Sequence, residues 1–92
     1  MDSDGYPLEE EIEKIKKWPP RDGKGLLEYV SSIWHWDNYA WQKGKLWFLS
    51  TGGWSGNEEL IDAMQENLVW WMFHWYRSTR GGHYEFQPRD KE

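Results

Sequence analysis

Residues 50–86 have the sequence STGGWSGNEELIDAMQENLVWWMFHWYRSTRGGHYEF, and this stretch decides the fold that we predict. It opens with the end of a strand and a glycine-rich loop at residues 51–57. The pattern then predicts one long helix from Glu58 to Ser78, a glycine break at residues 81–82 and a last strand at residues 83–86. We interpret the rest of the chain as material that covers this helix.

The long helix is predicted from the spacing of its hydrophobic residues. Apolar side chains recur at helical intervals at Leu60, Ile61, Met64, Leu68, Trp71, Met72 and Trp75. We expect Asp62 and Glu66 to face water and Trp71 and Trp75 to be buried. The second half of the helix is apolar on every side, which predicts burial in the core or against a partner.

Two short helices and a hairpin are predicted before the glycine-rich loop. Hydrophobic spacing predicts helices at residues 7–18 and 22–34, which Pro19 and Pro20 separate. Residues 39–42 and 45–49 have the pattern of two strands joined across Lys43-Gly44. The second of these strands is apolar on both faces, so we expect it to be central in the sheet.

The predicted fold class is α+β. The element order is α-α-β-β-α-β, with a small three-stranded antiparallel sheet, one long C-terminal helix and two short N-terminal helices. Ninety-two residues allow a single domain over residues 1–92, and residues 1–6 and 88–92 are predicted to be flexible tails.

Composition excludes several classes of function. The chain has no cysteine, which rules out a disulfide scaffold and thiolate metal ligation, and its net charge of −5 argues against general nucleic-acid binding. An acidic, polar N-terminus indicates no signal peptide, and no apolar run approaches the ~20 residues of a membrane span. Mimicry of nucleic acid or binding to a basic partner stays open.

The two glycine motifs are the candidate ligand site. A glycine-rich loop before a helix can present backbone amides to an anion, and an arginine and a histidine can add donors. The candidate ligand-binding residues are Thr51, Gly52, Gly53, Trp54, Ser55, Asn57, Arg80 and His83.

Both motifs also have a purely structural explanation. Ser55 and Glu58 have the spacing of a capping box, with Asn57 as an alternative N-cap, and Gly81 or Gly82 can end the helix. Because the predicted helix separates the motifs, we expect them to share a site only across the sheet or between two copies of the chain.

No catalytic constellation stands out, and the chain is interpreted as a non-enzyme without cofactors. His35, His74 and His83 lack the spacing of a metal site. His74 lies among aromatic residues, so a hydrogen-bonded core histidine is expected there. No nucleophile elbow is present, and Glu58-Glu59 are most simply acidic residues at a helix start.

Nine tryptophans exceed what one small core needs. They can be structural, form a stacking platform for bases, or anchor a protein partner. We expect Trp36, Trp41 and Trp54 to be partly exposed. The candidate partner-interface residues are Trp36, Trp41, Trp70 and Phe73. If two of Trp70, Phe73 and Tyr76 are exposed, a homodimer that buries them is the simplest arrangement.

The motifs TGGWSGNE at residues 51–58 and STRGGHY at residues 78–84 carry a resemblance to a known family. The chain resembles a family of short bacteriophage and prophage proteins, over nearly its whole length from Leu8 to Phe86. The resemblance implies a phage setting and the bacterial cytoplasm, and it supplies no catalytic residues.

Taken together, these features predict a non-enzymatic binding protein that acts on a host component, for example in counter-defence. Its partner is expected to be a host protein. The alternatives are sequestration of a small anionic ligand, such as a nucleotide signal, and a structural or virion-assembly role.

Overall fold

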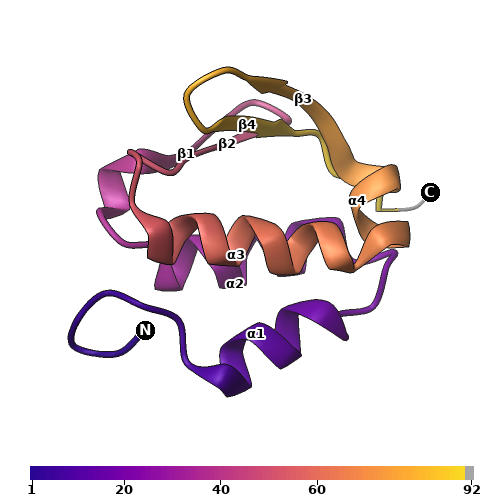
Figure 1. Ribbon diagram of the computed structural model, residues 1–92. Coiled ribbons are helices and arrows are strands. Elements are labelled where there is room, and N and C mark those ends of the chain that lie inside the picture. The colour runs from indigo at the N-terminus through magenta and orange to yellow at the C-terminus, as the bar shows by residue number, and fades with distance from the viewer. Residues whose placement is uncertain (91–92) are drawn as a thin grey trace.

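The computed structural model describes residues 1–90, which form a small α+β fold (Figure 1). The elements in chain order are α1 (Glu9–Lys16), α2 (Gly23–Ile33), the 3-10 turn η1 (Asp37–Tyr39), β1 (Ala40–Lys43), β2 (Leu46–Ser50), α3 (Ser55–Glu66), α4 (Leu68–His74), β3 (Trp75–Thr79) and β4 (His83–Phe86).

The four strands form one antiparallel sheet in the order β1-β2-β4-β3. The prediction that residues 45–49 form a central strand is confirmed, because β2 lies between β1 and β4. The predicted hairpin is also present, but Lys43 pairs with Leu46, so the turn residues are Gly44 and Lys45. Gly44 has a φ of 62°, which a glycine adopts without a steric penalty.

The fourth strand occupies the end of the predicted helix, so the prediction of three strands and one long helix over residues 58–78 is wrong. The helix stops at Asn67, whose buried side-chain amide donates hydrogen bonds to the carbonyls of Ile15 (3.1 Å) and Trp18 (2.9 Å). After the short helix α4 the backbone becomes extended at Trp75 (φ −67°, ψ 133°). Pairing with β4 then satisfies the backbone groups of β3, whose aromatic and β-branched residues suit a strand.

The helices lie on one side of the sheet, and its other face is uncovered (Figure 1). Helices α2 and α3 lie beneath the sheet, and α1 packs against α3 from the far side. The core between these layers contains Ile15, Leu26, Leu27, Val30, Trp34, Trp47, Leu49, Leu60, Ile61, Ala63, Met64, Trp70 and Phe86. Because side chains alternate along a strand, Phe86 faces this core and its neighbour Glu85 points to the uncovered face.

The burial pattern of the predicted helix is confirmed in its first half only. Asp62 and Glu66 on α3 are exposed, as expected. Trp71 is only half-buried and Trp75 is exposed, which contradicts the prediction of burial. For Trp75 the reason is the end of α4 at His74, after which the residues of β3 are all exposed on an edge strand.

The expected capping box at the start of the long helix is not formed. Helix α3 begins at Ser55 with Trp54 as its N-cap, and that N-cap makes no side-chain capping bond. The Ser55 hydroxyl instead contacts the Tyr6 hydroxyl at 3.0 Å, and the Trp54 indole N–H donates to the carbonyl of Gly5 at 2.6 Å. The N-terminal residues thus form a turn against Trp54.

The C-terminal segment is held against α2. The Asp90 carboxylate accepts from the backbone amides of Gly23 (2.7 Å) and Lys24 (3.1 Å), which are the first two residues of that helix. The Arg89 amide donates to Nδ1 of His74 (2.9 Å), and Nε2 of His74 therefore donates to the Pro20 carbonyl (2.8 Å). The prediction that His74 is a hydrogen-bonded core histidine is confirmed. Of the predicted C-terminal tail, residues 91–92 lie outside the described part of the chain.

Candidate functional site

The two glycine motifs meet within one chain. The Thr51 amide donates to the carbonyl of Gly82 at 2.9 Å, and Ser50 and His83 are cross-strand partners in β2 and β4. Of the two expected ways for the motifs to meet, across the sheet or between two copies, the structure shows the first. Strand β3 runs back along the sheet and brings the turn at residues 80–82 beside the loop at residues 51–57.

Three amides of the glycine-rich loop donate hydrogen bonds within the protein. Besides the Thr51 amide, the Gly53 amide donates to the Thr51 hydroxyl (3.3 Å) and the Trp54 amide to the Thr51 carbonyl (3.0 Å). Thr51 itself is buried, whereas Gly52 and Gly53 are exposed. The loop is thus a packed connection, and these three amides do not face a ligand.

Asn57 is a structural residue of this loop. Its side chain is fully buried and accepts from the His35 amide (3.0 Å). The same side chain donates to the carbonyls of His35 (3.0 Å) and Thr51 (3.3 Å). Asn57 therefore ties the loop to the segment after α2, and neither ligand binding nor helix capping is its role in this structure.

A row of polar side chains crosses the uncovered face of the sheet from β2 to β3. The hydroxyl of Ser50 lies 2.7 Å from Nδ1 of His83, and Nε2 of His83 lies 3.3 Å from the Glu85 carboxylate. The same carboxylate oxygen lies 3.1 Å from Nε of Arg77. The His83 ring thus lies between the Ser50 hydroxyl and the Glu85 carboxylate, with one ring nitrogen toward each.

A serine, a histidine and a carboxylate in series are also the groups of nucleophilic hydrolysis. That chemistry needs two donors that face the developing oxyanion. The amides of Thr51 and Gly53, one and three residues after Ser50, already have partners. The geometry therefore favours a network that fixes His83 and Glu85 on the sheet over one that attacks a substrate.

An aromatic platform lies beside this row. The rings of Trp41 and Phe48 are nearly parallel, with centroids 5.1 Å apart and an angle of 9°. The His83 ring lies 5.8 Å from Trp41 and 6.0 Å from Phe48. We call these three mutually close rings, Trp41, Phe48 and His83, the aromatic platform. Of its members, sequence reasoning missed Phe48, because only the strand register shows that it shares a face with Trp41.

The platform ends at a corner formed by the turn before β1. Trp36 has a φ of 64° and is the one non-glycine residue among residues 1–90 with a positive φ. A Cβ on Gly52 would lie 2.8 Å from the Trp36 ring and 2.9 Å from the Tyr39 ring, so the glycine permits this close approach. Trp36 and Tyr39 are both exposed, and the expectation of partly exposed Trp36, Trp41 and Trp54 is confirmed.

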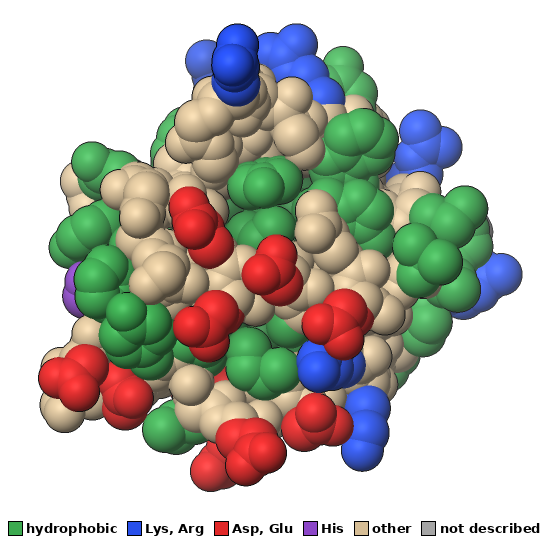
Figure 2. Space-filling view, in the orientation of Figure 1, with side chains coloured by type: hydrophobic (Ala, Val, Ile, Leu, Met, Phe, Trp, Pro, Cys, Tyr) green, Lys and Arg blue, Asp and Glu red, His purple; other side chains and the backbone are tan. Residues whose placement is uncertain are grey.

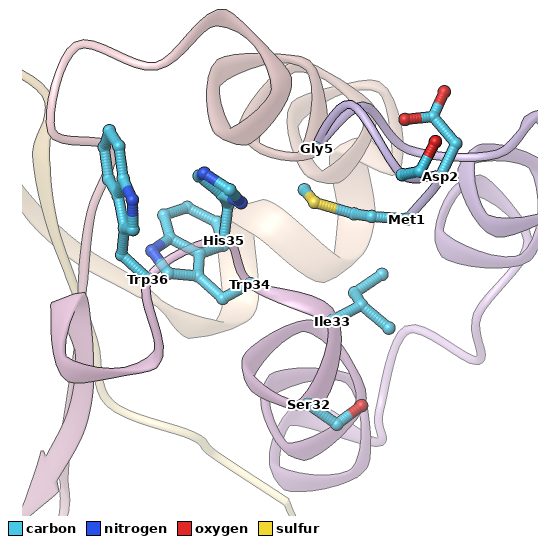
Figure 3. Close-up of a pocket in the computed structure, with 9 residues that line it drawn as sticks. Met1, Asp2, Gly5, Ser32, Ile33, Trp34, His35 and Trp36 are labelled. Atoms are coloured by element: carbon cyan, nitrogen blue, oxygen red, sulfur yellow. The ribbon is translucent and has the colours of Figure 1, made fainter.

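A hollow of about 240 Å³ opens at this corner and is lined by Asn38, Tyr39, Trp41 and Ser50. A second hollow, of about 370 Å³, lies between the N-terminal turn and the end of α2 (Figure 3). There His35 points between Trp36 and the side chain of Met1, and Ile33 lines the lower side. The His35 ring packs against the rings of Trp36 (4.7 Å) and Trp54 (5.3 Å), which accounts for its position.

A second exposed surface covers α4 and the start of β3. We call it the α4–β3 surface and define it by the exposed residues Leu68, Val69, Met72, Phe73, Trp75 and Tyr76. Trp70, which was predicted to contact a partner, has no exposed area, because it packs on Phe86 and its indole N–H donates to the Asp22 carbonyl at 3.1 Å. The prediction that Trp70 contacts a partner is therefore wrong. Phe73, which was predicted with it, is exposed.

Charge is divided between the two halves of the molecule. Residues 40–54 and 75–90, which form the sheet and its loops, carry five basic and two acidic side chains, a net charge of +3. The rest of residues 1–90 carries five basic and thirteen acidic side chains, a net charge of −8. Figure 2 shows acidic side chains gathered over the helices and basic ones above the sheet.

Two tyrosines near the helices have perturbed acidity. Burial raises the pKa of Tyr84 above its ordinary value of 10.0, and the carboxylates of Asp62 and Glu58 raise it further. Burial likewise raises the pKa of Tyr29, with smaller contributions from Glu11 and Glu10. Both shifts follow from low solvation beside acidic helices, and neither tyrosine belongs to the aromatic platform.

Within residues 1–90, no group of three or more His, Cys, Asp or Glu side chains is placed to hold a metal ion. None of the helices in this range has the length and hydropathy that crossing a membrane requires. Comparison of the chain with family models, with curated proteins and with solved structures gives no match. The function must therefore be inferred from the aromatic platform and the α4–β3 surface.

Proposed function

We propose that this chain is a non-enzymatic binding protein of phage or prophage origin that acts on a host protein in the bacterial cytoplasm. The observation that carries the proposal is the α4–β3 surface. Its two most exposed members, Met72 and Leu68, are 71% and 61% exposed, and both are large apolar residues. Clustered apolar side chains of this kind mark protein interfaces, whereas single exposed ones do not.

The surroundings of this surface indicate the chemistry of the partner. The Arg21 guanidinium lies 5.7 Å from the centre of the Phe73 ring, and Arg77 follows Tyr76 directly in the chain. In Figure 2 hydrophobic side chains gather over α4 with basic side chains beside them. A partner with an apolar groove and an acidic rim would complement this arrangement.

Capture from a lysate of a bacterial host tests the proposal. Immobilised wild-type protein should retain a host protein that the Met72→Glu variant does not retain, because the new carboxylate would be desolvated in the interface. Leu8→Glu is the matched control, since Leu8 is also exposed but lies before α1. Protection of α4 and β3 from hydrogen exchange in the purified complex would locate the contact.

Three results would contradict this function. Equal capture by wild type and Met72→Glu would exclude the α4–β3 surface as the binding site. A wild-type dimer in light scattering that Met72→Glu converts to a monomer would show that the surface serves the homodimer expected as an alternative. A wild type that captures no host protein would favour a structural or virion-assembly role.

The alternative function, retention of a small anionic ligand by the glycine-rich loop, has less support. The amides of Thr51, Gly53 and Trp54 already donate within the protein, so these donors are not free for an anion. Arg80 is exposed at the same end of the sheet, but both ring nitrogens of His83 already face partners within the protein.

A further inference from the structure

We propose that the uncovered face of the sheet binds single-stranded nucleic acid, with one base held in the hollow beside Trp41. This site is separate from the α4–β3 surface, and the proposal does not depend on the function assigned to that surface. Three observations carry it: the aromatic platform, the hollow at its corner and the positive charge of the sheet half.

The platform offers a stacking surface for bases. Trp41, Phe48 and His83 are mutually 5.1 to 6.0 Å apart with interplanar angles of 9° to 31°. No helix covers this face, and Trp41 is 44% exposed although it stacks on Phe48. Aromatic rings on an open sheet are a common means of holding unstacked bases, since every base has a π-face.

The hollow extends the stacking surface, because its lining is almost entirely apolar. Tyr39 and Trp41 supply ring faces, and Asn38 and Ser50 complete the lining. Its volume of about 240 Å³ suits one base rather than a larger molecule. The positive φ of Trp36 places the turn that presents Asn38 and Tyr39, and backbone strain of this kind is concentrated at functional sites.

Basic side chains surround the platform. Lys43 lies two residues after Trp41 and therefore shares its face of β1, Arg77 lies on β3, and Arg80 lies in the turn before β4. Among the described residues of strands β1 to β4, Glu85 is the single acidic residue. Its side chain is buried against Arg77 and His83. The net charge of −5 therefore does not describe this face. The expectation against nucleic-acid binding was based on that net charge, which combines a basic half and an acidic half.

The arrangement favours a single strand over a duplex. The bases of a duplex stack on one another, so their faces cannot reach Trp41 or the hollow. A flexible strand can place one base in the hollow and others on the platform while its phosphates approach Lys43 and Arg80. Binding should therefore depend on stacking and weaken as the salt concentration rises.

Fluorescence anisotropy with labelled oligonucleotides of about ten nucleotides tests the proposal. The full chain should bind single-stranded DNA or RNA more tightly than a duplex of the same length. Trp41→Leu should weaken binding about 5- to 150-fold, which is the range for loss of one base–aromatic stack. Trp75→Leu is the matched control, because Trp75 is 42% exposed but belongs to the α4–β3 surface.

The salt dependence gives a readout that a merely structural effect would not produce. Lys43→Gln and Arg80→Gln should each lower the slope of log Kd against log salt by about 0.7, because each removes one phosphate contact with a single strand. Circular dichroism of every variant establishes that it is folded. If Trp41→Leu does not fold, loss of binding in folded Tyr39→Leu takes its place.

Four outcomes of the oligonucleotide experiments would overturn the proposal. They are no binding of either kind of single strand, equal affinity for the duplex, unchanged affinity in Trp41→Leu, and equal loss in Trp75→Leu. A free mononucleotide that binds as tightly as the oligonucleotide would also overturn it, since the platform and the basic side chains would then contribute nothing.

Discussion

Replacement of Asn57 provides the sharpest test of how the glycine-rich loop is held. Asn57 is fully buried and makes three hydrogen bonds, two with the backbone of His35 and one with the carbonyl of Thr51. At about 1 kcal/mol for each net hydrogen bond, Asn57→Ala should lower the free energy of unfolding by about 3 kcal/mol. In a domain of this size, that loss corresponds to a fall in Tm of roughly 12 to 24 °C.

Asn57→Asp separates hydrogen bonding from side-chain size. The aspartate has nearly the same shape, but it places an oxygen where the Asn57 amide nitrogen faces the carbonyls of His35 and Thr51. Two donors are lost, and a buried carboxylate is set against two acceptors. We therefore expect Asn57→Asp to be less stable than Asn57→Ala at neutral pH, although its shape is closer to that of the native residue.

Urea unfolding followed by far-UV circular dichroism measures these differences. The midpoint should fall in both variants with little change in the m-value, which would show that stability rather than the denatured state has changed. Gln65→Ala, an exposed position on α3, is the control and should stay within about 0.5 kcal/mol of wild type. A loss below about 1 kcal/mol in Asn57→Ala, or an Asn57→Asp variant more stable than Asn57→Ala, would refute the reasoning.

Three further predictions follow from the same structure. Gly81→Ala should cost about 1 kcal/mol for its positive φ. Gly82→Ala should cost more than about 2 kcal/mol in urea unfolding, because its Cβ would also clash with the Thr51 hydroxyl; equal costs would exclude that contact. Because burial raises the pKa of Tyr84, the unfolded chain loses its phenol proton at lower pH than the folded chain, and the free energy of unfolding should decline above about pH 10. The free energy of unfolding of Tyr84→Phe should decline less with pH, and an identical decline would contradict the shift. Trp70→Ala should cost about 3 to 5 kcal/mol in thermal unfolding, and a near-neutral result would place Trp70 at the surface.

Local patterns in the sequence predicted the first two helices, the hairpin and the last strand. Local sequence gave no reason to end the helix before residue 78. The stretch is apolar at most positions, so its hydrophobic pattern is compatible with a helix. The break depends on bonds from Asn67 to the carbonyls of Ile15 and Trp18, about 50 positions earlier in the chain. Propensity gives way to tertiary contacts at such a point.

The candidate site was predicted in part. Arg80 and His83 lie at the end of the sheet where the glycine-rich loop begins, but Asn57 and the loop amides are used for packing. The aromatic platform was not predicted, because it requires the pairing of Trp41 with Phe48 and of Ser50 with His83. Strand register over such separations is set by the whole fold and leaves little local signal in the sequence.

The break after α4 also leaves β3 as an open edge, which affects how the molecule can associate. An unpaired edge strand invites backbone pairing with another chain and hence ordered aggregation. In β3 the register shifts between Trp75 and Arg77, and Arg77 carries a charge in the middle of the strand. Both features obstruct continuation of the sheet. A partner protein at this edge must therefore be recognised through side chains. Its amino-acid sequence would then determine whether it binds, and an extended backbone alone would not suffice.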